Sequence, residues 1–224
     1  MEKNAPAKSW LALFTLEFML AVLLLLLSAS VFGFIAHYCI TVRDQNNFDH
    51  RIYILLTQHA GPALTRQVQR ITFLGSGTVL APAYLLIALI LLLQKRKQLA
   101  AALIAIAGSS MLLNVILKNI YQRSRPALAH LDAVQGYSFP SGHSMGAFTF
   151  CGLIIFVIWK SRVPRWLQLI SAILLSLLAI LIGCSRIYLG VHFASDVLAG
   201  FFVTVLWLSL CFMLWQLAKH RHWV

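Results

Sequence analysis

The chain has 224 residues, of which 60% are hydrophobic and only 11% are charged, and its formal net charge is +12. A soluble domain usually carries about 25% charged residues, so this composition excludes an ordinary soluble domain and indicates an integral membrane protein. The basic residues fall in short clusters between apolar stretches, a distribution typical of membrane topology signals, which argues against nucleic acid as a partner.

Six apolar stretches are long enough to cross a bilayer, which takes about 20 residues. In chain order they span about residues 11–38, 73–94, 99–117, 144–160, 166–184 and 195–217. They predict an all-α polytopic membrane protein with six transmembrane helices, folded as a single domain over residues 1–224. The first stretch is longer than the apolar core of a signal peptide, about 7–15 residues, so we interpret it as an uncleaved helix.

The segment at residues 42–72 follows the first stretch. Its apolar residues are spaced as in amphipathic helices, and Gly61 and Pro62 interrupt the pattern. We expect short helices at the outer membrane surface. Two interpretations stay open: these helices border the route to a site, or they are plain interfacial structure.

Some polar residues within the apolar stretches have no assigned role. Glu17 lies near the inner interface, where it can reach water or Lys8, and a functional role for it stays open. The cysteines are dispersed and are expected to pack among apolar neighbours; a Cys39–Cys184 disulfide is conceivable but is not predicted. The four cysteines are Cys39, Cys151, Cys184 and Cys211.

The alternation of helices brings two distant segments together. Residues 118–143 and 185–196 must meet the same membrane face, whichever way the protein is inserted. The short loops at 94–97 and 159–165 and the tail at 219–222 are basic, which predicts that their face, with both termini, is cytoplasmic. The face that carries residues 118–143 is then the outer one.

Three polar strings occupy the junctions at that outer face. They are KNIYQRSRP (118–126), PSGH (140–143) and SRIYLGVHFASD (185–196). Lys118, Arg125 and Arg186 bring three cations to one place, and such a cluster needs an anion; the planar fork of arginine matches phosphate oxygens. Ser141 and Gly142 lead into the fourth apolar helix, whose free N–H groups and dipole also favour an anion.

Two histidines face this predicted anion site. His192 and Asp196 are four residues apart, so one helical face carries both, and the carboxylate can accept the Nδ1 proton and leave Nε2 nucleophilic. His143 has no such carboxylate partner and is a candidate general acid. Arg123 is interpreted as an ordinary interfacial cation. A metal held by the two histidines and Asp196 is the alternative, which three neighbouring cations disfavour.

These strings match the pattern K-x6-RP, PSGH and SR-x5-H-x3-D, and the sequence thereby resembles the type 2 phosphatidic acid phosphatase (PAP2) superfamily. The resemblance implies hydrolysis of a phosphoester or pyrophosphate through a phosphohistidine, without metal or cofactor. It implies His192 as nucleophile, Asp196 as its partner and His143 as acid. It also implies phosphate ligands, namely Lys118, Arg125, Ser141, Gly142 and Arg186. The small bacterial members that act on phosphatidylglycerol phosphate or undecaprenyl pyrophosphate are the most similar.

We therefore expect a lipid phosphatase in the bacterial inner membrane, with a lipid phosphate or pyrophosphate and the bilayer as partners. Its active site is expected to face the periplasm or exterior. The motifs identify neither the headgroup nor the oligomeric state, although His130 and Asp132 lie where they can influence headgroup choice. Two alternatives stay open: a phosphotransferase that passes the phosphate to another lipid, and a non-catalytic lipid-phosphate transporter or binder. A haloperoxidase is disfavoured by the bilayer-spanning composition.

Overall fold

The computed structural model describes residues 15–41, 47–127 and 135–220, and within these ranges the chain is helical, without strands. The helices are α1 (Leu16–Thr41), α2 (Asn47–Thr57), α3 (Pro62–Leu74), α4 (Gly77–Leu93), α5 (Lys97–Tyr121), α6 (Gly142–Trp159), α7 (Arg165–Tyr188) and α8 (Ala194–His220). Six helical segments in these ranges are long and apolar enough to cross a membrane. The prediction of an all-α polytopic membrane protein with six spans is confirmed.

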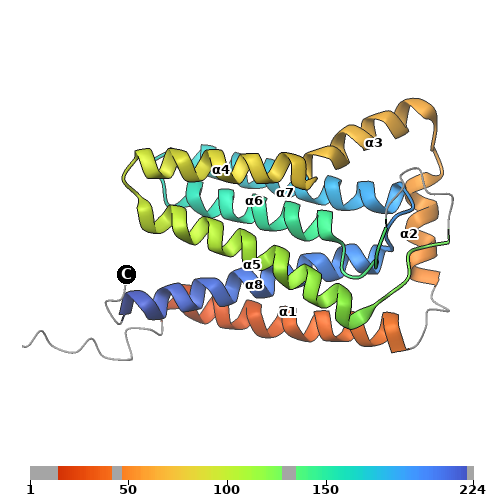
Figure 1. The fold of residues 1–224 in the computed structure, drawn as a ribbon, viewed down its shortest axis with the longest axis horizontal. Coiled ribbons are helices and arrows are strands. Elements are labelled where there is room, and N and C mark those ends of the chain that lie inside the picture. The colour runs from red at the N-terminus through yellow and green to blue at the C-terminus, as the bar shows by residue number, and fades with distance from the viewer. Residues whose placement is uncertain (1–14, 42–46, 128–134, 221–224) are drawn as a thin grey trace, which may run out of the picture.

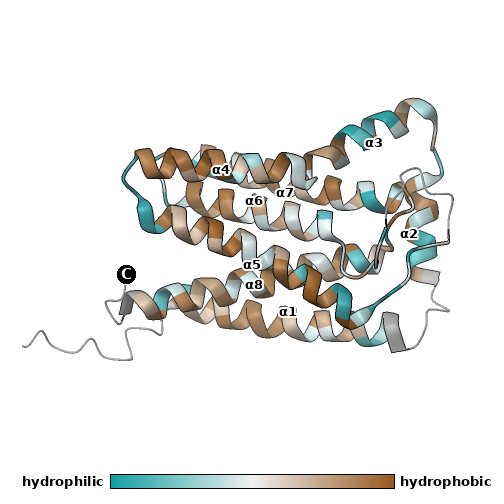
Figure 2. Ribbon diagram, viewed as in Figure 1, coloured by the Kyte–Doolittle hydropathy of each residue, from teal (hydrophilic) through white to brown (hydrophobic). Residues whose placement is uncertain are grey.

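The long helices run side by side along the long axis of the molecule, and α2 and α3 lie together at one end (Figure 1). The C-terminal end of α8 lies at the opposite end, as do the α4–α5 turn and the start of α1. The long helices are mostly hydrophobic along their length, whereas hydrophilic residues gather on α2, on α3 and at the α4–α5 turn (Figure 2). We call the end that carries α2 and α3 the α2–α3 end.

The helix boundaries differ from the predicted ones mainly at the α2–α3 end. α5 continues to Tyr121 and α7 to Tyr188, beyond the apolar stretches predicted to end at 117 and 184. A helix satisfies its own backbone hydrogen bonds, so it can extend past the apolar region and carry polar side chains at its last turn. The ends of the helices, not only the loops, therefore supply polar residues to this end of the bundle.

The segment predicted as short outer helices forms α2 and α3. The break falls just before Pro62, which occupies the first turn of α3, where its missing N–H costs nothing. α3 and α4 together form one continuous candidate span, Pro62–Leu93, so the second span begins earlier than predicted. Residues 42–46 lie outside the described ranges.

Helix α8 is the central element of the packing, since it contacts α1, α2, α5, α6 and α7. Small residues permit the close approach of its neighbours. A Cβ on Gly183 of α7 would lie 2.8 Å from Val197 Cγ1, and a Cβ on Gly200 of α8 would lie 3.2 Å from the carbonyl oxygen of Ser141. Small residues at helix interfaces are a usual device of membrane bundles, and here they bring α6, α7 and α8 together beneath the α2–α3 end.

An apolar cavity of about 680 Å³ lies in the other half of the bundle, between α1, α5, α6 and α8. Glu17 is at its edge and forms an exposed ion pair with Lys160 at 3.5 Å. Lys8, the partner expected for this carboxylate, lies outside the described residues. No predicted site residue lines this cavity. Cys184 is a free thiol, and the side chain of Cys39 lies outside the part that the structure describes.

Candidate active site

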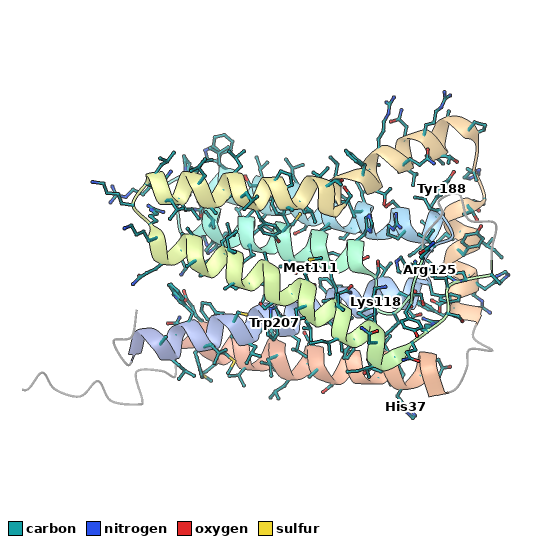
Figure 3. The ribbon with its side chains drawn as sticks, in the orientation of Figure 1. His37, Met111, Lys118, Arg125, Tyr188 and Trp207 are labelled. Carbon is teal, nitrogen blue, oxygen red and sulfur yellow. The ribbon has the colours of Figure 1, made fainter. Side chains whose placement is uncertain are left out.

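The three polar strings meet at the α2–α3 end. Figure 3 shows Lys118 and Arg125 there, whereas Met111 and Trp207 lie nearer the middle of the bundle. Each predicted residue sits at the end of a helix or in the adjoining loop: Lys118 in the last turn of α5, Arg125 in the following loop, Ser141, Gly142 and His143 at the start of α6, Arg186 in the last turn of α7, His192 in the α7–α8 loop, and Asp196 in the first turn of α8.

His192 is held between a carboxylate and a guanidinium. Its Nδ1 lies 3.3 Å from Asp196 Oδ2, and its Nε2 lies 3.3 Å from Arg125 Nη1. An ionised carboxylate only accepts and a guanidinium only donates, so both contacts are hydrogen bonds only if Nδ1 carries the proton and Nε2 accepts. The geometry therefore selects the tautomer with an unprotonated Nε2, as predicted.

The surroundings also keep this imidazole neutral. Burial lowers the pKa of His192 from its ordinary value of 6.5 to about 4, although the hydrogen bond that His192 donates to Asp196 opposes that shift. The cations Arg125 and Lys118 act in the same direction as burial. A neutral ring with Nε2 unprotonated is the form that can attack phosphorus.

Asp196 is fully buried and each of its carboxylate oxygens is engaged. Oδ2 accepts from the backbone N–H of Phe193 at 2.9 Å as well as from His192. Oδ1 accepts from Arg123 Nη1 at 2.7 Å. A buried charge is tolerated only when it is paired and hydrogen-bonded, and this carboxylate meets both conditions.

Backbone carbonyls hold the cations of the first string. Arg125 donates to the carbonyl oxygens of Val191 at 2.8 Å and Gly136 at 3.0 Å. Lys118 Nζ donates to the carbonyl oxygen of Tyr137. Neutral carbonyls orient these cations without cancelling their charge, which leaves a positively charged cluster next to His192 Nε2.

Arg186 reaches the site from α7 and is almost fully buried. Its Nη1 donates to Thr72 Oγ1 at 2.8 Å, which ties α7 to α3. Lys118, Arg125 and Arg186 lie close enough to act on one another electrostatically. Such a cluster of cations favours a bound anion.

The start of α6 is built around Ser141 and Gly142. Ser141 caps the helix, since its Oγ accepts from Ser144 Oγ at 2.9 Å and from Ser144 N at 3.4 Å, and its own N–H donates to the carbonyl oxygen of Asp196 at 3.1 Å. A Cβ on Gly142 would lie 3.1 Å from Asn114 Oδ1, so the absence of a side chain permits close packing on α5. Sequence reasoning missed Asn114, which donates to the carbonyl oxygen of Pro140 at 3.2 Å and thereby holds this loop.

His143 follows Gly142, and its titratable neighbours are the cations Arg186, Arg125 and Lys118 and the neutral ring of His192. Within the described ranges, no side chain or backbone group forms a hydrogen bond with its imidazole. Its ring also packs against the α3–α4 junction, where a Cβ on Gly75 would lie 3.6 Å from His143 Cδ2. The two imidazoles thus approach the same cation cluster from different elements, His143 from the start of α6 and His192 from the α7–α8 loop.

The interpretation of Arg123 as an ordinary interfacial cation is wrong. Its side chain is only 10% exposed, it forms ion pairs with Asp196 at 2.7 Å and Asp49 at 3.1 Å, and its guanidinium lies 4.0 Å from the centre of the Phe193 ring. Asp49, on α2, was not considered. The available signal was the spacing: in extended chain, residues two apart point the same way, so Arg123 and Arg125 reach the same region.

Two further expectations concern the loop residues His130 and Asp132 and a possible metal site. His130 and Asp132 lie outside the described residues. Within the described ranges, no three His, Cys, Asp or Glu side chains gather as a metal-binding group. The His143, His192 and Asp196 set is therefore not a three-ligand cluster.

Comparisons with known proteins agree with this geometry. The family model of the PAP2 superfamily matches residues 98–220, which contain all three strings. The chain is 34% identical over 145 residues to phosphatidylglycerophosphatase B of Bacillus subtilis, covering 62% of this chain and 70% of that protein. It is 30% identical over 142 residues to the undecaprenyl-diphosphatase BcrC of the same organism, covering 60% of this chain and 67% of the relative.

Two solved structures are similar. The crystal structure of a transmembrane PAP2-type phosphatidylglycerolphosphate phosphatase from Bacillus subtilis has a TM-score of 0.75 and 28% identity, covering 84% of this chain and 93% of that one. LpxE of Aquifex aeolicus has a TM-score of 0.58 and 29% identity, covering 74% of this chain and 96% of that one. The family match, over more than half of the chain, and the shared fold agree with the three motifs. This chain belongs to the PAP2 superfamily.

Proposed function

We propose that this protein is a membrane lipid phosphatase that hydrolyses a lipid phosphate or pyrophosphate through a phosphohistidine. The observation that carries the proposal is the buried His192 ring, with Nδ1 on Asp196 and Nε2 facing the cation cluster. A binding protein needs the cations, but it has no use for an imidazole whose tautomer is fixed. The relatives named as phosphatidylglycerophosphatase B and undecaprenyl-diphosphatase support a hydrolase acting on phosphate esters of lipids.

In the first half-reaction, the phosphate lies among Lys118, Arg125 and Arg186, at the start of α6. Nε2 of His192 attacks phosphorus, the N–P bond forms, and the bond from phosphorus to the leaving oxygen breaks. His143 gives a proton to that oxygen. The cations stabilise the charge on the phosphoryl group during transfer, and Asp196 balances the positive charge on the His192 ring.

In the second half-reaction, water replaces the lipid at the same position. His143 now accepts a proton from the water as its oxygen attacks phosphorus, the N–P bond breaks, and inorganic phosphate leaves. His192 returns to the neutral ring with its proton on Nδ1. The group that acted as an acid in the first step acts as a base in the second, so the site is restored after each turnover.

The substrate class follows from the position of the site at one end of an apolar bundle. A lipid can place its phosphate among the cations while its tails stay in the bilayer. Undecaprenyl pyrophosphate and phosphatidylglycerol phosphate are the favoured substrates. The basic residues Lys95 and Lys97, at the α4–α5 turn, and Lys160, after α6, lie at the opposite end, which supports cytoplasmic termini and a site facing the periplasm or exterior of a bacterial inner membrane.

The test is phosphate release by the purified, detergent-solubilised protein in EDTA, with undecaprenyl pyrophosphate, phosphatidylglycerol phosphate and phosphatidic acid offered side by side. We expect release that survives EDTA and is lost in His192→Ala. The ranking of the rates identifies the substrate class. Release abolished by EDTA, or retained by His192→Ala, overturns the phosphohistidine mechanism. A phosphorylated acceptor lipid in place of free phosphate identifies a transferase.

A further inference from the structure

Arg123 connects two carboxylates that belong to different helices. Its Nη1 donates to Asp196 Oδ1 and to Ser195 Oγ, both at 2.7 Å, and its Nη2 donates to Asp49 Oδ2 at 3.1 Å. The arginine lies in the loop after α5, Asp49 lies on α2, and the other two residues begin α8. One side chain thus joins three elements directly behind the His192–Asp196 pair.

This network is almost closed to solvent. The side chains of Arg123, Asp49 and Asp196 are 10%, 5% and 0% exposed. A buried ion pair seldom adds net stability over apolar residues of the same size, whereas removing one partner leaves an uncompensated charge. Stability alone is therefore a weak explanation for two carboxylates and a guanidinium at this place. Their position beside His192 suggests that they act on the His192–Asp196 pair instead.

The contact from Arg123 decides how the Asp196 carboxylate is oriented. With Oδ1 bound to Arg123, Oδ2 is the oxygen that faces His192 Nδ1, and the N–H of Phe193 holds it at 2.9 Å. Arg123 and Arg125 thus hold opposite ends of one pair, the first at the carboxylate and the second at Nε2 of the imidazole. The carboxylate stays charged and correctly turned because a cation is fixed on its far side.

Asp49 fixes Arg123 and also the start of α8. Its Oδ1 accepts from Ser195 N at 2.7 Å, and its Oδ2 accepts from Ser195 Oγ at 2.7 Å. A carboxylate at a helix N-terminus satisfies a free N–H and is favoured by the helix dipole. The same helix, α2, packs Ile52 and Leu56 against a buried cluster that includes Ala194, so α2 is docked by both polar and apolar contacts.

We propose that Arg123 and Asp49 are positioning residues for the nucleophile: Asp49 anchors Arg123 from α2, and Arg123 orients and charge-compensates Asp196, so that His192 keeps its proton on Nδ1. Neither residue is a phosphate ligand in this scheme. The inference rests on the proposed function for its kinetic consequence, but its structural consequence, the tautomer of His192, exists without substrate.

The kinetic experiment compares Arg123→Gln, Arg123→Lys and Asp49→Asn with wild type, using the lipid that wild type hydrolyses fastest. Arg51→Gln, which removes an exposed cation from α2, is the matched control. Loss of a group that orients a reacting residue typically costs about 10- to 100-fold, so we expect kcat of Arg123→Gln to fall by about 100-fold and that of Asp49→Asn by about 10-fold. KM and the inhibition constant of inorganic phosphate stay within about 3-fold, because the cations that bind phosphate are untouched.

Arg123→Lys keeps the charge and is expected to recover at least about 10-fold of the lost kcat, whereas Arg51→Gln retains wild-type kinetics. Two results contradict the proposal: a folded Arg123→Gln with kcat within about 3-fold of wild type, or an unchanged kcat with a raised KM, which makes Arg123 a binding residue. Thermal unfolding in detergent establishes that each variant is folded. If the glutamine variant does not fold, the lysine and Asp49→Asn variants decide.

The second measurement does not depend on activity. Nitrogen chemical shifts of ¹⁵N-labelled histidine report which ring nitrogen carries the proton, and the His192→Ala spectrum assigns the signal. We expect the Nδ1–H form in wild type and a substantial Nε2–H population in Arg123→Gln. An unchanged tautomer overturns the positioning role even if wild type is an active phosphatase. If the tautomer changes in Arg123→Gln but wild type releases no phosphate, the positioning role is supported and only the proposed function is contradicted.

Discussion

Replacement of Asp196 by Asn tests the nucleophile directly, since it keeps the size of the side chain and removes only the charge. The amide must present one NH₂ and one carbonyl oxygen to two sets of donors. On one side lies Arg123 Nη1 at 2.7 Å, and on the other lie the Phe193 N–H at 2.9 Å and His192 Nδ1 at 3.3 Å. Arg123 is charged and closest, so we expect the carbonyl oxygen to face Arg123 and the NH₂ to face His192.

In that orientation, Nδ1 of His192 must accept a hydrogen bond, and the ring proton moves to Nε2. The nucleophilic lone pair is lost, and Nε2–H now opposes Arg125 Nη1, a donor at 3.3 Å. The corresponding substitution in a serine-protease triad lowers kcat by about 10⁴-fold through the wrong tautomer, which corresponds to about 5 kcal/mol of barrier. We expect a loss of that order in kcat, with KM changed much less because the cations proposed to bind phosphate remain.

The assay is steady-state phosphate release in detergent, together with acid-quenched trapping of the phosphoenzyme from a phosphorus-labelled lipid. Glu17→Gln, the same chemical change at an exposed carboxylate in the opposite half of the bundle, is the control and is expected to behave as wild type. A folded Asp196→Asn variant within about 10-fold of wild-type kcat refutes the argument that the carboxylate fixes the tautomer of the nucleophile.

Three further predictions concern stability. Burial lowers the pKa of His192 from 6.5 to about 4, so between these pH values the unfolded chain binds a proton that the folded chain does not bind, and the free energy of unfolding drops by up to about 3 kcal/mol as the pH falls. We expect His192→Gln to make the pH dependence of Tm shallower. Equal slopes for the variant and wild type contradict the pKa shift. Asn114→Leu leaves the carbonyl oxygen of Pro140 without its buried donor and lowers stability by about 1–3 kcal/mol by thermal unfolding; an unchanged Tm counts against that role. Gly75→Ala places a Cβ 2.5 Å from Ile182 Cγ2 and is expected to lower the free energy of unfolding by about 1–3 kcal/mol. Ile182→Ala should relieve this clash, so additive losses of stability in the double variant argue against it.

Much of the site was readable from the chain because its residues act through local geometry. The short spacing of His192 and Asp196 allowed the pair to be predicted, and the structure shows them hydrogen-bonded. The expected shared helical face is wrong, however, because His192 lies in the loop before α8 and only Asp196 lies on the helix. Helix parity placed residues 118–143 and 185–196 at one end of the bundle, since each membrane-spanning helix reverses the side of the chain. The six apolar stretches were predictable because the bilayer imposes a minimum length on each span.

Contacts between distant segments were not readable in this way. Asp49 and Asn114 lie in segments without a motif, and nothing in the neighbouring sequence shows that α2 caps α8 or that α5 holds the Pro140 carbonyl. Arg123 was misread because an arginine at a helix end is usually an interfacial residue, and its two carboxylate partners lie 74 and 73 positions away. The length of α3–α4 was also underestimated, since the polar residues of α3 hide its continuity with the apolar α4.

By itself, the sequence determined the membrane class, the six spans and the three motifs that hold the candidate site residues, because those depend on composition, length and short-range spacing. Only the tertiary structure decided which groups contact and orient these residues. The charge and orientation of Asp196 depend on a cation from the loop after α5 and a carboxylate from α2, and side chains that far apart in the chain meet only when the bundle packs.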